Sequence, residues 1–345
     1  MLTKNSVHRL VAKIGCSLLI ILSTLQSSQA EESAVILMYH RFGESAHPST
    51  NIGLEQFEAH IDELLNGGYT VLPIPDILTA IKSNQPLPKK TIGITIDDAY
   101  LSVYRKAWPR LRRAKFPFTL FIATDAIDRK FDGYMNWNQI RELRASGVTI
   151  GSQTASHLHM SANRPIRNRE DIQLSNTRFK NEIGSKPSLF AYPFGEASTD
   201  IQNIIKEAGF THAFGQHSGA LNASSDKYYM PRFALNENFG GIKRFKLISN
   251  VLGINYIDLT PSNPTLQENP PLFGFTLKKE AEHINDITCY SGAQGKLRMQ
   301  RLGPRIEVRL DYKFSPGRAR INCTAPTSNG NWRWFGMLYY VPKVL

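Results

Sequence analysis

The sequence predicts an α/β fold with a parallel sheet or barrel, followed by a small β-rich domain. From Ala34 onward, short apolar runs alternate with amphipathic stretches, which is typical of repeated β/α units. Beyond about Asp258, polar and apolar residues alternate instead, which is typical of half-buried antiparallel strands. The length of 345 residues, with 41% hydrophobic and 10% aromatic residues, fits one large domain or two and excludes a disordered chain.

The first part of the chain is predicted to form β/α units in order. A continuous apolar run at 34–39 predicts a buried strand, and the amphipathic stretch at 54–66 predicts a helix that ends at Gly67 and Gly68. In such folds the chemistry lies at the carboxyl ends of the strands. Further strands are predicted at 91–96, 119–122, 148–150 and 211–214, with helices over 108–114, 137–146 and 201–208.

The C-terminal part is predicted to be a separate β domain over residues 261–345, after a barrel domain over 31–260. Between the two, four prolines make a stiff connector, namely Pro261, Pro264, Pro270 and Pro271. The alternation at 305–310 predicts a half-buried strand in the second domain. The sequence assigns this domain no role.

The first 30 residues have the features of a secretory signal peptide. Lys4, Arg9 and Lys13 precede an apolar run at 14–25, and a small-residue cleavage site ends at Ala30. The alternative, a membrane anchor, is disfavoured because the run is shorter than the roughly 20 residues that span a bilayer. Cleavage after Ala30 would leave no transmembrane segment, and the expected location is the periplasm or the outside of the cell.

The charge distribution favours an anionic partner other than nucleic acid. The formal net charge of +12 falls to +9 when the three cations of the signal peptide are removed, and residues beyond Pro264 hold +6 of that charge. Because lysine and arginine are spread without runs, nucleic acid is not an expected partner. The basic C-terminal domain is instead predicted to contact an anionic envelope or polymer.

Two cysteines remain after the signal peptide, Cys289 and Cys323. Export would place them in a compartment where disulfides persist, so a bridge between them is the simple prediction. Two buried free thiols are the alternative.

Side chains with metal-binding or acid–base chemistry follow several of the predicted strands. Asp97 and Asp98 end the strand at 91–96, where they indicate either a helix cap or a site in which a cation separates the roles of two carboxylates. His157 follows a later strand, and carboxylates and imidazoles from neighbouring strand ends are the ligands that divalent transition metals prefer. His40 follows the first strand.

At these positions the sequence resembles the polysaccharide deacetylases, the NodB homology family that is also classed as carbohydrate esterase family 4. Thr95-Ile96-Asp97-Asp98 resembles the family's T-F-D-D motif, and Gln153-Thr154-Ala155-Ser156-His157 stands where the family has H-[ST]-x-x-H. Tyr192-Pro193-Phe194-Gly195 is similar to the end of its R-x-P-[YF] motif. Met38-Tyr39-His40 resembles the start of the exported poly-N-acetylglucosamine deacetylases, whose barrel is circularly permuted. The resemblance covers roughly residues 34–258 and implies a distorted (β/α)7-type barrel.

The resemblance implies a metal-dependent hydrolase that removes N-acetyl groups from an amino-sugar polysaccharide, which is a non-peptide C–N bond hydrolysis. Asp98, His157 and Gln153 would hold a divalent metal, with zinc the expected ion, and the metal would act as a Lewis acid on the acetyl carbonyl. Asp97 would take a proton from the attacking water, and His40 would protonate the departing nitrogen.

The resemblance also implies that Tyr192, Pro193 and Phe194 contact the sugar. Gln153 stands in place of the family's first metal histidine, and an amide oxygen is a weaker ligand for zinc than an imidazole. This leaves weak metal binding, a substitute ligand such as His159, or a catalytically weak or inactive carbohydrate-binding homologue in the cell envelope. An envelope structural protein held by its basic surface is a further alternative.

Three more positions bear on the expected site. Ala191 replaces the arginine that orients the catalytic aspartate in many family members. His217, in a polar loop after the strand at 211–214, is a candidate substrate contact at the barrel mouth. Arg232 is expected either to face the site or to make a surface ion pair.

Overall fold

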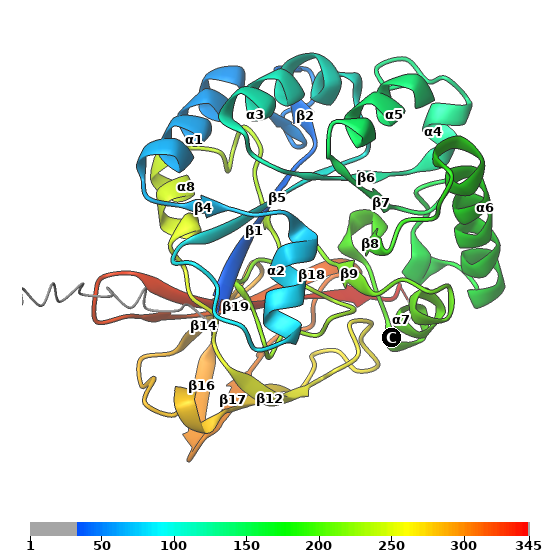
Figure 1. Cartoon of the computed structure of the whole chain (residues 1–345). Helices are drawn as coiled ribbons and strands as arrows, with labels where there is room; N and C mark the ends of the chain where they lie inside the picture. The colour runs from blue at the N-terminus through cyan, green and yellow to red at the C-terminus, as the bar shows by residue number, and fades with distance from the viewer. Residues whose placement is uncertain (1–32, 344–345) are drawn as a thin grey trace, which may run out of the picture.

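The computed structural model describes residues 33–343, in which a curled parallel sheet is surrounded by helices (Figure 1). Seven strands run parallel in the order β11-β1-β5-β6-β7-β8-β9. A parallel bridge between Phe214 and Met230 brings the segment before β11 against β9, so the sheet curls towards a barrel. The predicted α/β barrel is confirmed. The strands are β1 (Ser33–Tyr39), β5 (Thr91–Asp97), β6 (Thr119–Ile122), β7 (Thr149–Ser152), β8 (Leu189–Ala191), β9 (His212–Phe214) and β11 (Phe233–Ala234).

The helices pack around this sheet, and short strands complete it. Each helix and strand predicted for this part of the chain is present, with ends shifted by a few residues at most. The helices are α1 (Leu54–Asn66), α2 (Ile74–Lys82), α3 (Trp108–Ala114), α4 (Thr124–Asp128), α5 (Trp137–Ala145), α6 (Pro165–Ile183), α7 (Thr199–Glu207) and α8 (Ile242–Ser249). The short strands are β2 (Arg41–Phe42), β3 (Asn51–Ile52), β4 (Thr70–Val71) and β10 (Leu221–Asn222).

Helix α1 begins and ends where its sequence indicates. Phe57, Ile61 and Leu64 are buried at helical spacing. The N–H of Gly53 donates to the Gln56 side chain at 3.1 Å, which satisfies one of the free donors at the helix start. The helix ends at Gly67, and the following glycine adopts a positive φ of 73° that other residues rarely reach.

Helix α6 was not predicted from the sequence, although it is 19 residues long. Its buried face carries Asn168, Asp171 and Ser175 next to the apolar Ile172 and Phe179. These polar residues interrupt the apolar stripe, so the helical pattern is weak. Buried polar groups need hydrogen-bond partners, and Asp171 and the Asn168 amide nitrogen find theirs in the loop that follows β7, while Ser175 pairs with Ser152 at the end of β7.

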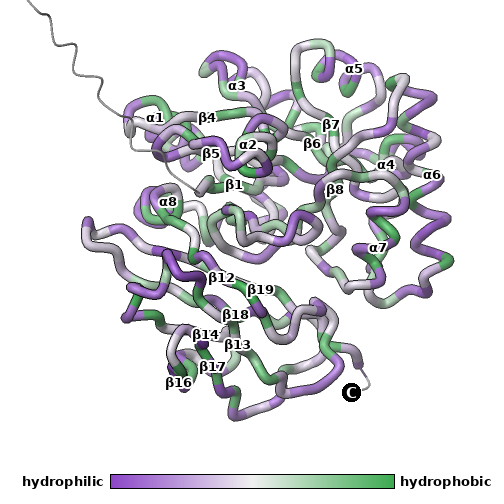
Figure 2. The backbone as a smooth tube through the Cα atoms, turned by 60° about the horizontal axis from the view of Figure 1, so that its bottom comes forward, coloured by the Kyte–Doolittle hydropathy of each residue, from purple (hydrophilic) through white to green (hydrophobic). Residues whose placement is uncertain are grey.

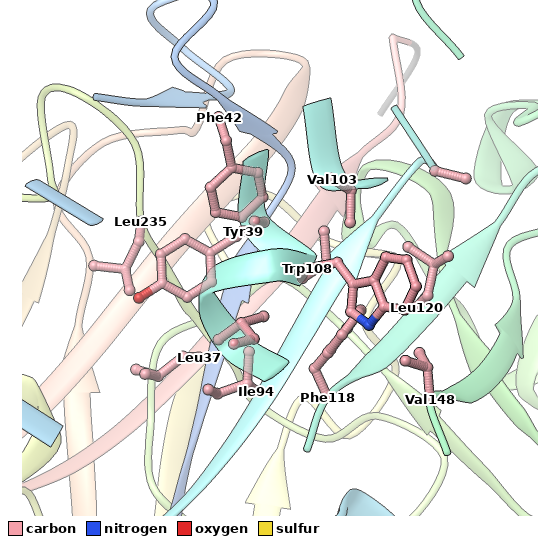
Figure 3. Close-up of a cluster of buried hydrophobic side chains, with 14 of the residues drawn as sticks. Leu37, Tyr39, Phe42, Ile94, Val103, Trp108, Phe118, Leu120, Val148 and Leu235 are labelled. Carbon is pink, nitrogen blue, oxygen red and sulfur yellow. The ribbon is translucent and has the colours of Figure 1, made fainter. Parts of the chain in front are cut away.

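The main apolar core lies between the sheet and the helices that cover it (Figure 3). Leu37 and Tyr39 of β1, Ile94 of β5 and Trp108 of α3 belong to one buried cluster. Ile36, the intervening residue of β1, joins a second cluster with α2. The strands are buried on both faces, which explains why they read as continuous apolar runs.

The C-terminal region forms two four-stranded antiparallel sheets, in the orders β12-β13-β17-β16 and β15-β14-β18-β19. The predicted disulfide is present, and it joins Cys289 of β14 to Cys323 of β18 at directly paired positions. The strands are β12 (Tyr256–Thr260), β13 (Phe273–Leu277), β14 (Thr288–Ser291), β15 (Gly295–Lys296), β16 (Arg298–Leu302), β17 (Arg305–Arg309), β18 (Gly317–Pro326) and β19 (Trp332–Val341).

These sheets are packed firmly against the barrel, as Figures 1 and 2 both show. One apolar cluster runs from Phe190 and Ile201 of the barrel to Phe273 and Phe335 of the C-terminal sheets. The Tyr229 hydroxyl donates to the Leu338 carbonyl oxygen at 2.8 Å across the same boundary. The position of the C-terminal sheets relative to the barrel is therefore fixed by a shared core. In residues 33–343, no helix is long and apolar enough to cross a membrane.

Candidate active site

The predicted catalytic and metal-binding residues gather at the carboxyl ends of the parallel strands. His40 follows β1, Asp97 ends β5 and Asp98 follows it, and His157 lies in the loop after β7. His40, Asp98 and His157 line one cleft of about 1080 Å³. Neighbouring strand ends in a parallel sheet place these side chains close together, as expected.

Asp97 is fully buried and makes a two-pronged ion pair with Arg232, the residue before β11. The Arg232 Nη1 and Nη2 atoms donate to the two Asp97 oxygens at 2.7 and 2.9 Å. The guanidinium is itself fully buried and donates through Nε to the Gly215 carbonyl oxygen at 2.9 Å. Of the two expectations for Arg232, the structure therefore supports the one that directs it to the site. Arg232 fixes the orientation of the Asp97 carboxylate.

His40 lies next to this ion pair. Its Nε2 atom is 3.9 Å from Asp97 Oδ2, and its side chain is 14% exposed, towards the cleft. That distance is too long for a hydrogen bond, so the imidazole can still face a ligand in the cleft. His40 therefore lies between the buried Asp97 carboxylate and the cleft, within reach of a proton donor or acceptor bound there.

Asp98 and His157 lie next to each other in the lining of the cleft. Asp98 Oδ1 lies 3.4 Å from His157 Nε2, yet this buried oxygen has no hydrogen-bond partner among residues 33–343. Both residues have positive φ angles, 74° for Asp98 and 55° for His157. Such backbone conformations are strained for side chains of this kind and cluster at functional sites.

Helix α6 holds the loop that carries His157. The buried Asp171 carboxylate accepts hydrogen bonds from the Ala155 N–H at 2.9 Å and from the Ser156 N–H at 3.0 Å. The Ser156 hydroxyl donates to the other Asp171 oxygen at 2.7 Å. The buried polar residues that weaken the helical pattern of α6 in the sequence therefore hold a loop of the site in position.

Gln153 is completely buried after β7, and neither atom of its amide has a hydrogen-bond partner in the described chain. Leaving a buried amide unsatisfied costs about 1–3 kcal/mol. Together with the unpartnered Asp98 oxygen and the adjacent His157 nitrogen, the Gln153 amide oxygen fits a divalent cation held by oxygen and nitrogen ligands. In residues 33–343, no three His, Cys, Asp or Glu side chains are grouped so that they could hold a metal, so any third protein ligand must be of another type.

His159 does not take the place of the missing histidine. Its Nδ1 atom is 3.0 Å from Glu196 Oε2, and its ring stacks on Phe194 with centroids 3.7 Å apart. The described residues hold no group in which His159 joins Asp98 and His157 around an ion. Its role in the structure is to support the Phe194 ring.

The three predicted sugar contacts occupy different environments. Phe194 lines the cleft, where its ring edge meets His157 with centroids 4.6 Å apart. Tyr192 is fully buried on the other side of the strand, and its hydroxyl donates to the Tyr228 carbonyl oxygen at 2.8 Å. Pro193 is buried as well. Only Phe194 has a side chain placed to touch a ligand in the cleft.

His217 faces a second cavity rather than this cleft. Its neighbours Gln216 and Ser218 line the cleft, whereas the His217 side chain lines the cavity on the other side of the loop. Burial, with the nearby charges of Arg320 and Arg232, lowers the pKa of His217 to about 3. The expectation that His217 contacts substrate therefore finds no support in the geometry of the main cleft.

Several cleft residues were not singled out from the sequence. The exposed rings of Phe131 and Phe239 form part of its walls, as do Arg318 and Arg320 of the distant strand β18. Flat aromatic faces of this kind suit sugar rings. The alternation around 318–322 marks a half-buried strand, but no sequence signal says that this strand reaches the barrel.

Comparison with known proteins agrees with this geometry. The family model for polysaccharide deacetylases matches residues 84–213. A poly-beta-1,6-N-acetyl-D-glucosamine N-deacetylase of Staphylococcus aureus is 25% identical over 234 residues, which span 60% of this chain and 80% of the relative. The solved structure of IcaB from Ammonifex degensii is 26% identical with a TM-score of 0.57, covering 64% of this chain and 99% of IcaB. The deacetylase PplD of Streptococcus pyogenes, solved with acetate, shares the fold at 18% identity with a TM-score of 0.58, covering 62% of this chain and 96% of PplD.

Over its barrel the chain resembles the polysaccharide deacetylases. Members of this family are hydrolases that act on carbon–nitrogen bonds other than peptide bonds. In this chain, Ala191 stands where many members of that family have an arginine that orients the aspartate, and Arg232, the residue before β11, makes that contact instead. Between 36% and 40% of the chain lies outside these three alignments.

Proposed function

We propose that this protein is an exported, divalent-metal-dependent deacetylase that removes N-acetyl groups from an amino-sugar polysaccharide. The observation that carries the proposal is the convergence of four residues at one end of the sheet: His40, Asp98 and His157 line a single cleft, and Asp97 is buried 3.9 Å from His40. The resemblance to this family supplies the reaction class, and deacetylases of this family are generally metal-dependent. The Staphylococcus aureus relative acts on poly-β-1,6-N-acetylglucosamine, which supports an acetylated glycan as substrate.

In this proposal Gln153 joins these four residues, and each of the five side chains has its own role. Asp98, His157 and the Gln153 amide oxygen hold the cation, with zinc the first candidate. When bound, the cation polarises the acetyl carbonyl and lowers the pKa of water at the site. Asp97, held by Arg232, accepts a proton from the attacking water through a lone pair that the guanidinium leaves free. His40, on the cleft side of Asp97, donates a proton to the departing amine.

The surroundings suit a sugar chain and an exported protein. Phe131, Phe194 and Phe239 offer rings to the sugar faces along the cleft. The Cys289–Cys323 disulfide is compatible with the periplasm or the extracellular space, where such bonds persist. The predicted signal peptide at 1–30 supports the same location, but it lies outside the described residues. Residues 31–260 would form the catalytic domain, with residues 261–345 added to it.

Acetate release from N-acetylglucosamine oligomers, both β-1,4- and β-1,6-linked, tests the proposal. The protein is assayed after chelation and after addition of zinc, manganese or cobalt, and activity is expected to return with metal. His40→Gln is expected to lower kcat by about 100-fold or more, as for loss of a general acid. His283→Gln, at an exposed histidine remote from the cleft lining, serves as the matched control and is expected to retain full activity.

A second candidate function is favoured by Gln153, whose position holds a histidine in the metal site of the family. In that case the protein would bind acetylated glycans without hydrolysing them. Glycan binding with no acetate release under any metal would support this alternative and would refute the deacetylase proposal.

A further inference from the structure

The C-terminal sheet β15-β14-β18-β19 turns one of its faces towards the barrel. Along β18, Ala319, Ile321 and Cys323 are buried inside the C-terminal region, whereas Arg318 and Arg320 point to the opposite face. On the paired strand β19, that opposite face contacts the barrel. A Cβ atom added at Gly336 would lie only 2.3 Å from the Ser218 carbonyl oxygen, which shows how closely β19 packs on the loop after β9.

The same face continues past β19 and becomes a wall of the active-site cleft. Arg318, Arg320 and Asn322 of β18 line the cleft together with Asp98 and His157. Arg318 also donates to the Phe194 carbonyl oxygen at 3.4 Å, so the wall touches the barrel next to the candidate sugar contact. The C-terminal region thus supplies one wall of the cleft.

This wall carries positive charge without matching carboxylates. Among the ion pairs of residues 33–343, none includes Arg318, Arg320 or the cleft residue Arg244. The Asp125 carboxylate in the cleft is already paired with Arg129 at 3.1 Å. Partial burial and the charge of Arg318 lower the pKa of Arg320, as expected where two guanidinium groups lie close together with no anion between them.

An aromatic ring and a lysine extend the wall outward. Tyr290 of β14 pairs directly with Asn322 on one side and with Lys296 of β15 on the other, and paired residues of antiparallel strands share a face. The Tyr290 side chain is 42% exposed. We call this surface the cationic shelf, and it consists of Tyr290, Lys296, Arg318, Arg320 and Asn322.

We propose that the cationic shelf binds acidic groups of the glycan, so that the substrate is an N-acetylated polysaccharide that also carries carboxylate or phosphate groups. The inference rests on the proposed deacetylase function, because the shelf and the catalytic residues share one cleft. Guanidinium groups match carboxylate and phosphate oxygens in geometry and charge. The Tyr290 ring would stack on a neighbouring sugar. A neutral polymer of N-acetylglucosamine has no acidic group that could pair with these guanidinium groups.

The test compares three substrates at equal chain length. These are a neutral N-acetylglucosamine oligomer, a glycan in which N-acetylglucosamine alternates with a uronic acid, and an N-acetylglucosamine oligomer with phosphate groups. At low salt, kcat/KM is expected to be about tenfold higher on at least one acidic glycan than on the neutral one, and salt is expected to reduce this ratio. The acidic glycan that gives the higher ratio identifies carboxylate or phosphate as the recognised group.

Two variants test whether the cationic shelf causes the higher kcat/KM on acidic glycans. Arg318→Gln/Arg320→Gln is expected to lower the acidic-to-neutral ratio about tenfold. Arg309→Gln removes an equally exposed arginine of the same region that is not in the cleft lining, and it is expected to leave the ratio within about twofold of the original. Arg309, Arg318 and Arg320 are surface residues that make no ion pair among residues 33–343, so circular dichroism and Tm are expected to stay unchanged and would show that the variants fold.

The outcomes separate this inference from the proposed function. A ratio near one on both acidic glycans, or a ratio that survives the double substitution, would overturn the inference and leave the deacetylase proposal standing. If no glycan releases acetate, equilibrium binding of the same three glycans decides. Preferential binding of an acidic glycan that is lost in the double variant supports the shelf, while equal binding of all three refutes it.

Discussion

Removal of the Asp97 carboxylate should destabilise the protein as well as inactivate it. In Asp97→Asn, the fully buried Arg232 guanidinium faces a neutral amide in place of the two oxygens now at 2.7 and 2.9 Å. Breaking a buried ion pair by removing one partner costs about 3–5 kcal/mol. At about 2 °C per kcal/mol, the value for large domains, Tm is expected to fall by about 6–10 °C.

A double-mutant cycle separates this effect from catalysis. Asp97→Asn/Arg232→Met removes the unpaired charge and is expected to recover at least about 2 kcal/mol relative to Asp97→Asn, without recovery of activity. Asp98→Asn is the matched control at the next residue, because Asp98 Oδ1 has no hydrogen-bond partner in the described chain and makes no ion pair with an arginine. Its metal-free stability is expected to stay within about 1 kcal/mol of the original.

The measurement is urea denaturation followed by tryptophan fluorescence, with the disulfide intact and metal removed by a chelator. Acetate release is measured on the same samples. The reasoning fails if Asp97→Asn unfolds at the same urea concentration as the original protein, or if the double variant is no more stable than Asp97→Asn. Either result would mean that Arg232 and Asp97 do not form the buried ion pair that the structure describes.

Three further predictions concern the metal, the disulfide and pH. Gln153→His should raise zinc affinity at least about tenfold, seen as a larger thermal shift at fixed zinc, because imidazole is the better ligand; an unchanged shift would mean that residue 153 does not face the ion. Cys289→Ser/Cys323→Ser should lower the free energy of unfolding by about 3–4 kcal/mol, since the bridge closes a loop with a sequence separation of 34 residues, and equal urea midpoints would contradict this. His217 has a folded-state pKa of about 3 against 6.5 when unconstrained, so the unfolded chain binds the extra proton between these values. Its contribution to stability is therefore complete above about pH 6.5 and is lost as pH falls, by about 1.4 kcal/mol per pH unit. Urea titrations from pH 7 to pH 4 should show a shallower decline for His217→Phe, and an unchanged decline would contradict the assignment.

The sequence alone predicts the central strands of the barrel because the pattern that identifies each strand lies within the strand itself. The strands β1 and β5 are buried on both faces, so they appear as uninterrupted apolar runs. His40, Asp98 and His157 follow strand ends, and parallel strands carry such residues to the same edge of the sheet. Helix α6 was not predicted because its buried face carries polar residues, which bind a polar loop. The same residues interrupt the apolar periodicity by which a helix is recognised in a sequence.

Long-range packing accounts for what the sequence did not reveal. Arg232 is 135 residues from Asp97 and precedes a strand of only two residues, which has no periodicity to recognise. The alternation in β18 predicts that Arg318 and Arg320 share a face. It does not predict that this face meets the barrel, because that depends on the apolar cluster shared by the two regions.

The two departures from the family motifs have different consequences for activity. The loss of arginine at Ala191 is compensated, since Arg232, the residue before β11, delivers two hydrogen bonds to Asp97 and keeps the carboxylate oriented. The loss of histidine at Gln153 has no such compensation among residues 33–343, where no other His, Cys, Asp or Glu completes a three-ligand site with Asp98 and His157. Under the proposed function, the acid–base residues Asp97 and His40 are both in place, and the strength of metal binding at Gln153 decides between a hydrolase and a glycan-binding protein. Comparing acetate release by the original protein and by Gln153→His across a zinc titration isolates that property, because a higher activity of the variant at low zinc that disappears at saturating zinc would show that metal binding limits turnover.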